Sequence, residues 1–197
     1  SNKMHLNLVS SEHSKQVALA SQFEQRDKNT NQTVGILKLE KPIEVLFEGV
    51  DTDVYRPMDK HQIKGGFVDE INELVKEDFV YLHVGQLGKG GYGEDRKNIT
   101  LMVKCFLQAF TNHPNPPALL LKSNGANFSV LDRHDTLKRI RKQKDKFSSA
   151  DTLPSIYLLH GDLTIDEMAM LYNLPKIKGF LTCTHGEGYG RPMAEAT

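Results

Sequence analysis

The chain has 197 residues, which at roughly 100–200 residues per domain is enough for one domain and part of a second. Its 25 Lys and Arg residues balance 25 Asp and Glu residues, so no overall positive field favours a nucleic-acid partner, and we predict none. Two cysteines exclude a disulfide framework and a four-cysteine zinc site. Both lie in apolar runs, so we expect two buried thiols, as is typical of a reducing compartment. No apolar run approaches the roughly 20 residues that span a bilayer, and no transmembrane segment is predicted.

The first part of the chain contains short apolar runs separated by polar connections. We expect a strand at 5–9, a helix at 12–23, a polar loop at 25–33, and strands at 34–39 and 43–47. A turn-rich connection follows at 49–57 and contains the pair Asp51 and Asp53. Two closely spaced carboxylates can hold a divalent cation. A capped turn before Pro57 explains this pair better, and we predict no metal site.

From residue 79 onward, strands and helices alternate regularly. We expect strands at 79–84, 118–121, 155–159 and 179–184, and helices at 97–110, at 130–146, from Thr164 and from Arg191. Thr164 and Glu167 have the spacing of a capping box. The helix at 97–110 has one apolar face, formed by Ile99, Met102, Val103, Phe106 and Phe110. The alternation predicts an α/β fold, a Rossmann-like parallel sheet with helices on both faces, and ligands bind such sheets at the carboxyl ends of the strands.

Two motifs admit more than one interpretation. Gly88–Gly93 fits G-x-G-x-x-G, but a dinucleotide site needs the first glycine at the strand end and an acidic residue about 20 positions later. Neither condition holds, so a glycine loop beside a phosphate site is the better interpretation. The basic run at 138–146 has no interleaved aromatic residue. A solvated helix face explains it best, and an anionic-surface or nucleic-acid patch is the alternative.

The segment from Thr184 to Glu195 is the most informative. Three glycines separate a strand from a helix that has Pro192 near its first position, where proline is favoured. Free N–H groups and a helix N-terminus suit an anion, and the carboxylates of Glu187 and Glu195 suit vicinal diols. A sugar nucleotide carries both a diphosphate and diols. A plain β–α turn with a solvent-facing Glu187 is the equally weighted alternative on these grounds alone.

The stretch EGYGRPMAE at 187–195 resembles the E-x7-E signature of retaining GT-B glycosyltransferases, the group 1 family that uses nucleotide-sugar donors. Weaker similarities follow in the same order as in that family. Residues 49–57 resemble the linker into its donor domain, Arg96-Lys97-Asn98 resembles the start of its first helix, and 161–172 resembles its G-x-[LV]-[ST]-x-x-E segment. The resemblance covers roughly residues 5–197.

This resemblance implies roles for the matching residues. Glu187 would face the donor sugar and Lys97 would neutralise the leaving diphosphate, so these two are the expected catalytic residues. Glu195 would bind the ribose hydroxyls. Gln86, beside Gly85, stands where the family commonly has arginine; Arg96 is the candidate substitute, and a solvated residue at the helix start is the alternative interpretation of it. The other expected donor-binding residues are Gly188, Tyr189, Gly190, Arg191, Lys122 near phosphate and His160 near the base. A purely structural role is the alternative for His160.

The resemblance also implies an activity and a domain plan. The expected enzyme is a metal-independent hexosyltransferase with a nucleotide-diphosphate sugar as co-substrate, no other cofactor, and a glycan, lipid or other acceptor, as in polysaccharide biosynthesis. Residues 1–40 would be the tail of the acceptor domain, 41–78 a linker with a hairpin, and 79–197 a donor domain truncated at its C-terminus. A non-catalytic sugar-nucleotide or glycan-binding module is the alternative, and an epimerase or phosphorylase of the same architecture is a third. The expected location is cytoplasmic, with peripheral membrane attachment of a full-length enzyme left open.

Overall fold

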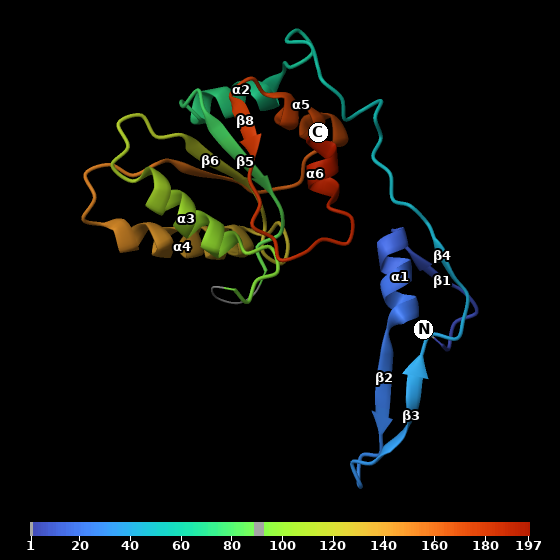
Figure 1. The fold of residues 1–197 in the computed structure, drawn as a ribbon. Coiled ribbons are helices and arrows are strands. Elements are labelled where there is room, and N and C mark those ends of the chain that lie inside the picture. Colours follow the sequence, from blue (N-terminus) through green and yellow to red (C-terminus); the bar gives the residue numbers. More distant parts are fainter. Residues whose placement is uncertain (1, 89–92) are drawn as a thin grey trace. The chain divides into compact units, whose positions relative to one another are not determined.

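The computed structural model describes residues 2–88 and 93–197 and divides into two compact units, Ser1–Gly49 and Val50–Thr197 (Figure 1). The division falls within the predicted linker at 41–78. Residues 89–92 of the predicted glycine loop lie outside the described part of the chain. Within the described part, no helix is long and apolar enough to cross a bilayer.

The first unit contains two small pairs of strands and one helix. Strand β1 (Asn7–Val9) pairs in parallel with β4 (Ile43–Val45), and β2 (Gln22–Arg26) pairs antiparallel with β3 (Thr33–Lys38). Helix α1 (Glu12–Ala20) ends at a Ser21 cap, so the prediction of helix to residue 23 is wrong. The polar loop is shorter than the predicted 25–33, and the hairpin forms at 22–38 rather than inside 41–78.

The reason for these differences is that β2 is exposed at all five positions. Polar residues therefore carry no burial signal there, and the turn fixes the pairing instead. The Asp27 carboxylate accepts hydrogen bonds from the N–H groups of Asn29 and Thr30 at 2.9 and 2.8 Å, and Asn31 adopts a left-handed conformation with φ 55°. These contacts reverse the chain between the two strands.

The second unit is a four-stranded parallel sheet, as the alternation of strands and helices predicts. Its strands are β5 (Val80–Val84), β6 (Ala118–Lys122), β7 (Ile156–Leu159) and β8 (Ile177–Phe180), in the order β7-β6-β5-β8. Strand β8 ends earlier than the predicted residue 184. Leu181 still donates its N–H to the Leu82 carbonyl at 2.8 Å, after which the chain leaves the sheet.

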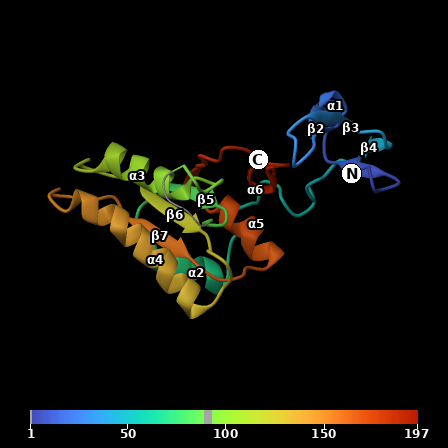
Figure 2. The ribbon, with the colours of Figure 1, turned by 90° about the horizontal axis from the view of Figure 1, so that it is seen from below.

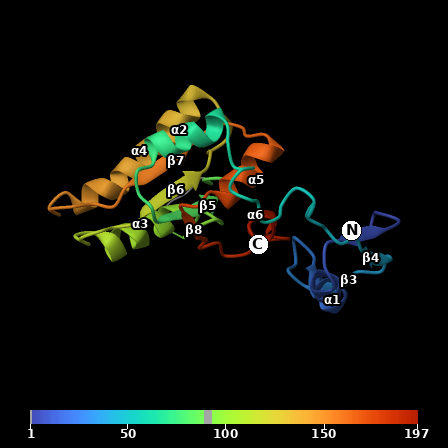
Figure 3. The same cartoon turned by 90° about the horizontal axis from the view of Figure 1, so that it is seen from above.

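Helices cover both faces of this sheet (Figures 2 and 3). Helices α3 (Ile99–Phe110) and α4 (Val130–Lys144) lie on one face, and α2 (Gly66–Leu74) and α5 (Ile165–Asn173) lie on the other. Strand residues alternate between the two cores: Leu82 and Leu120 pack toward α2 and α5, whereas Leu119 and Leu121 pack toward α3 and α4. A short 3₁₀ helix (Asp145–Phe147) and the terminal helix α6 (Arg191–Glu195) complete the unit.

Two side-chain predictions have different outcomes. The capping box at α5 is confirmed, since Glu167 N–H donates to Thr164 Oγ1 at 3.2 Å and Thr164 N–H donates to Glu167 Oε2 at 2.8 Å. The prediction of two buried thiols is wrong for Cys105, which is exposed, while Cys183 is half-buried. Cys105 lies on α3 outside the apolar face, whose buried members are Ile99, Met102, Val103, Phe106 and Leu107.

The strand order alone predicts where a ligand binds this sheet. The chain runs from β5 to β6 and β7 on one side, and then returns to β8 on the other side of β5. The loops that leave the carboxyl ends of β5 and β8 therefore diverge at a switch point, where open α/β sheets bind their ligands.

Candidate functional site

The loops after β5 and β8 meet at this switch point, although they lie about ninety residues apart in the sequence. The Arg96 carbonyl accepts hydrogen bonds from His185 N–H at 3.0 Å and from Thr184 Oγ1 at 3.2 Å. Arg96 Nη1 donates to the Gly186 carbonyl at 2.7 Å. Three hydrogen bonds therefore join the turn before α3 to the segment before Glu187.

The turn before α3 is itself fixed by a buried carboxylate. Asp95 is 3% exposed and accepts hydrogen bonds from the N–H groups of Lys97 at 3.2 Å and Ile99 at 3.4 Å. Asn98 adopts a left-handed conformation with φ 55° and begins the helix. Asp95 thus occupies two of the N–H groups at the start of α3.

The side chains of Arg96, Lys97 and Glu187 form a cluster at the switch point, which we call the switch-point cluster. Lys97 Nζ lies 2.6 Å from Glu187 Oε1, and Arg96 Nη1 lies 3.1 Å from Glu187 Oε2. Lys97 and Glu187 are largely buried, with 14% and 15% of their side-chain surface exposed, whereas Arg96 is 61% exposed. The cluster thus brings two cations together with one carboxylate, and the buried carboxylate of Asp95 lies in the same turn.

The electrostatics of Glu187 follow from these contacts. Burial alone would raise its pKa, but hydrogen bonds from Lys97, Arg96 and Thr184 outweigh burial and lower the pKa below its ordinary value. Glu187 is therefore ionised at neutral pH. A solvent-facing Glu187, the alternative interpretation, does not describe this carboxylate.

The second glutamate of the signature has a different set of partners. Glu195 Oε1 accepts a hydrogen bond from Arg191 Nε at 2.6 Å, and Oε2 accepts one from the Tyr172 hydroxyl at 3.2 Å. Only 8% of the Glu195 side chain is exposed. Burial first, and then the neighbouring Glu195 charge, raise the pKa of Tyr172 far above its ordinary value, so this tyrosine stays protonated and donates. Tyr55 packs edge-on against Tyr172, with 6.1 Å between ring centroids.

Glycines shape the backbone on both sides of the switch-point cluster. A Cβ on Gly85 would lie 2.8 Å from His83 Nε2, so only glycine fits there without movement of the neighbour. Gly190 is buried, caps α6 and has φ 82°, a conformation that side chains disfavour. Gly186 and Gly188 flank Glu187 with open space around them, and Tyr189 is half-buried.

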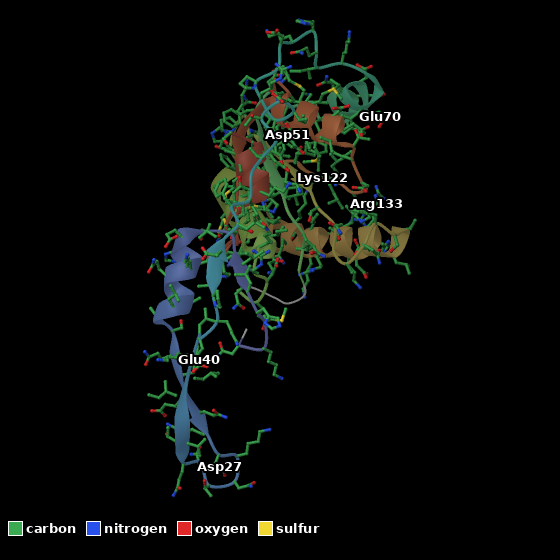
Figure 4. All side chains as sticks on the ribbon, turned by 90° about the vertical axis from the view of Figure 1, so that its right-hand side faces the viewer. Asp27, Glu40, Asp51, Glu70, Lys122 and Arg133 are labelled. Carbon is green, nitrogen blue, oxygen red and sulfur yellow. The ribbon has the colours of Figure 1, made fainter. Side chains whose placement is uncertain are left out.

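Three further predicted residues line a depression at the carboxyl ends of β5, β6 and the connection after β7. Gly85, Gln86 and Lys122 border a cavity of about 210 Å³, together with Val84, Asn124, Asp162, Leu163 and Met168. The Gln86 amide donates to the Gly125 carbonyl at 2.5 Å. Lys122, labelled in Figure 4, donates to the Gly161 carbonyl at 2.5 Å and lies 5.3 Å from the centre of the Phe128 ring. Burial lowers the pKa of Lys122.

His160, the predicted base-pocket residue, is paired with a carboxylate instead of lining that cavity. Its Nε2 lies 3.0 Å from Asp132 Oδ2, and its side chain is 4% exposed. Asp132 also accepts hydrogen bonds from the N–H groups of Gly125 and Ala126 at 2.8 and 2.6 Å. Burial would raise the pKa of Asp132, but the bonds from His160 and from the backbone lower it to about 2.

Three residues near the site were not predicted from the sequence. Asp95 and Asp132 have the sequence positions of ordinary loop and helix carboxylates, and the structure shows that each binds backbone N–H groups of a loop. His83 is 1% exposed in β5, bonds to the Leu181 carbonyl through Nδ1 at 2.8 Å, and has no hydrogen-bond partner at Nε2 among the described residues. Burial lowers the pKa of His83. A histidine inside an apolar strand was the available signal for it.

The carboxylate pair of the linker behaves as a turn. Asp51 Oδ1 accepts a hydrogen bond from Asp53 N–H at 3.0 Å, and the Asp51 carbonyl accepts one from Tyr55 N–H at 2.8 Å. Across residues 2–88 and 93–197, no group of three or more His, Cys, Asp or Glu side chains could hold a metal ion.

Comparisons with known proteins bear on the fold. No protein-family model matches the sequence, and no curated protein matches it. Several solved structures are similar to this chain in fold. The α,α-trehalose-phosphate synthase (UDP-forming) of Burkholderia xenovorans, in complex with glucose-6-phosphate, is 11% identical with a TM-score of 0.63, over 99% of this chain and 44% of that chain.

Two further structures are similar to the same extent. An Escherichia coli structure described as trehalose-6-phosphate bound with UDP-2-fluoro glucose is 13% identical with a TM-score of 0.58, over 99% of this chain and 43% of that chain. A trehalose-6-phosphate synthase is 12% identical with a TM-score of 0.57, over 100% of this chain and 44% of that chain. At these identities the likeness shows the fold: the chain shares the fold of GT-B glycosyltransferases and spans less than half the length of these proteins.

Proposed function

We propose that this chain binds a nucleoside-diphosphate sugar at the switch point and supplies the donor site of a retaining glycosyltransferase. The observation that carries the proposal is the switch-point cluster, in which two cations and a carboxylate from distant loops meet where this fold binds ligands. The fold likeness to trehalose-phosphate synthases supports glycosyl transfer as the general activity.

Charge explains how the cluster would act. Breaking the bond between the anomeric carbon and the diphosphate oxygen builds negative charge on the departing diphosphate. Lys97 and Arg96 would stabilise that charge, and the partly buried position of Lys97 strengthens the effect. The acceptor hydroxyl would bond to the anomeric carbon on the face that the diphosphate leaves, with its proton passing to a diphosphate oxygen. Glu187 would face the sugar, and no metal would be required.

Glu195 would bind the ribose. Arg191 and Tyr172 fix both of its oxygens, yet each carboxylate oxygen has a second lone pair that can accept a hydroxyl. A carboxylate held in this way presents a preorganised acceptor to a vicinal diol. The cavity beside Gly85, Gln86 and Lys122 would accommodate part of the nucleotide.

The test is a thermal-shift titration of the chain with UDP, GDP, ADP and CMP and with their sugar derivatives, with and without magnesium. A ligand that binds only the folded state raises the melting temperature. We expect a rise for one base, independent of magnesium and abolished in Glu195→Ala. Glu73→Gln, which changes an exposed glutamate on α2, serves as the control and should keep the shift.

The outcomes separate the candidate functions. No shift with any nucleotide or nucleotide sugar would contradict the proposal. A shift without sugar transfer or donor hydrolysis, in a preparation that includes the rest of the protein, would favour the non-catalytic binding module. Product formation from the donor without acceptor would favour an epimerase.

A further inference from the structure

In the switch-point cluster, Glu187 already pairs with the two cations that a bound diphosphate would need. Glu187 uses both carboxylate oxygens to pair with Lys97 and Arg96, at 2.6 and 3.1 Å. Under the proposed function, a diphosphate needs the same two cations. A phosphate group and an ionised carboxylate repel each other when they share one ammonium group at such short range. The diphosphate and the carboxylate would therefore compete for Lys97 and Arg96.

The side chain of Glu187 could move without moving the cations. The hydrogen bonds of Arg96 to His185, Thr184 and Gly186 hold the backbone on both sides of the cluster, as far as Gly186. Open space remains around Gly186 and Gly188, because a Cβ added to either would meet no atom within 4 Å. Rotation of the Glu187 side chain into this space would release Lys97 and Arg96 while the backbone stays in place.

We infer that Glu187 is an internal counter-ion, which the donor diphosphate displaces from Lys97 and Arg96, and that this exchange makes the site select a sugar-bearing diphosphate over a free one. The inference rests on the proposed function for the identity of the ligand. The exchange itself rests on the contacts of the cluster.

Selectivity follows from where the displaced carboxylate goes. An ionised carboxylate without hydrogen-bond partners is costly in a partly buried site. The hydroxyl groups of a donor sugar would supply new partners, whereas a nucleoside diphosphate without sugar supplies none. The free diphosphate also carries one more ionisable oxygen, which increases its repulsion by Glu187. After transfer, Glu187 would therefore return to its cations and help to expel the nucleotide product.

Isothermal titration calorimetry of the wild-type chain and of Glu187→Gln tests this inference. The ligands are inorganic pyrophosphate, the nucleoside diphosphate whose base gives the thermal shift, and the sugar derivative of that nucleotide. Removing the competing charge should tighten pyrophosphate and nucleoside-diphosphate binding by about tenfold and weaken binding of the nucleotide sugar by about tenfold. Glu73→Gln should change none of the three affinities. Pyrophosphate binding to Glu187→Gln that is no tighter than to the wild type would overturn the inference.

A second measurement uses the wild-type chain, so that it does not depend on the folding of the variant. The carbon-13 resonance of the Glu187 carboxylate, assigned by its loss in Glu187→Gln or in Glu187→Asp, should shift during titration with pyrophosphate. An unchanged resonance at saturating pyrophosphate would overturn the exchange.

Failure of the exchange and failure of the proposed function give different results. If the wild-type chain binds a nucleotide sugar and pyrophosphate binding does not tighten in Glu187→Gln, the exchange is wrong and the proposed function stands. If pyrophosphate binding tightens and no nucleotide sugar binds, Glu187 is a counter-ion but both the donor site and its selectivity are wrong.

Discussion

The two glutamates of the signature lie eight residues apart and are held in opposite ways. Glu187 is paired with two cations from the loop after the neighbouring strand β5, about ninety residues earlier in the chain. Glu195 is held by Arg191, one turn earlier on its own helix, and by Tyr172 of α5. One carboxylate thus depends on the junction of two loops, and the other depends on one contact within its own helix and one contact with α5.

This difference explains how one short segment can combine a movable group with a fixed group. Glu187 has charged partners that an anionic ligand can take over. Glu195 has an intrahelical partner and a neutral hydroxyl donor, neither of which needs to leave when a diol binds. We therefore expect changes around Glu187 to affect stability and ligand binding together, and changes around Glu195 at exposed positions to have small effects.

The largest effect is expected from Lys97→Met, which keeps the aliphatic stem and removes the ammonium group. Glu187 would keep only the exposed Arg96 as a charged partner, so we expect the free energy of unfolding to fall by about 2 kcal/mol, as for other hydrogen bonds to charged groups. Urea denaturation at pH 7 measures the loss. Lys138→Met on the exposed side of α4 is the matched control, and an equal loss in both variants would contradict the role of the ion pair.

The pH dependence of stability gives a smaller effect at the same carboxylate. Because the pKa of Glu187 is lowered in the folded chain from an ordinary value of 4.5, its stabilisation is present above about pH 4.5. The stabilisation is lost as the pH falls below that value and the carboxylate becomes protonated. The difference in unfolding free energy between the wild-type chain and Glu187→Gln should therefore be constant from pH 7 to about pH 5 and shrink toward pH 3. A difference that grows on acidification would contradict this assignment.

The same contrast between local and long-range contacts explains what the sequence could predict. From residue 79 onward, the strands and helices of the second unit follow from apolar runs and caps, and the α5 capping box is encoded within four residues. Glu187 and Lys97 were both predicted as site residues from the resemblance of their motifs. Their contact with each other could not be predicted, because it depends on where the chain returns to β8 after three crossovers. Asp95 and Asp132 were missed for a related reason: their importance lies in backbone groups that only the folded loops bring to them.

Elements without a burial signal were also missed or misplaced. Helix α2 has only nine residues and begins at Gly66 directly after Gly65, a glycine pair that resembles a turn, although Val68 and Ile71 are buried in the core. Strand β2 is exposed throughout, so its polar residues resemble a loop. The end of β8 was placed too late because residues 181–183 remain partly apolar after the chain has turned toward Arg96.

The smallest effect is expected from Arg191→Met, which tests the other side of the comparison. The Arg191 side chain is 69% exposed, and its pair with Glu195 is an i,i+4 contact within one short helix. Such pairs contribute about 0.5 kcal/mol or less, and the arrangement with the cation on the N-terminal side is the less favourable one. Glu195 keeps its bond from Tyr172, so we expect urea denaturation to show a loss of about 0.5 kcal/mol. We also expect the nucleotide sugar to bind somewhat more weakly, because Arg191 helps to orient the Glu195 carboxylate. A loss of unfolding free energy as large as that of Lys97→Met would show that the Arg191 pair stabilises the fold as much as the Lys97 pair does. Unchanged stability with strongly weakened nucleotide binding would instead place Arg191 in direct contact with the donor, because its guanidinium would then be needed by the ligand and not by the helix.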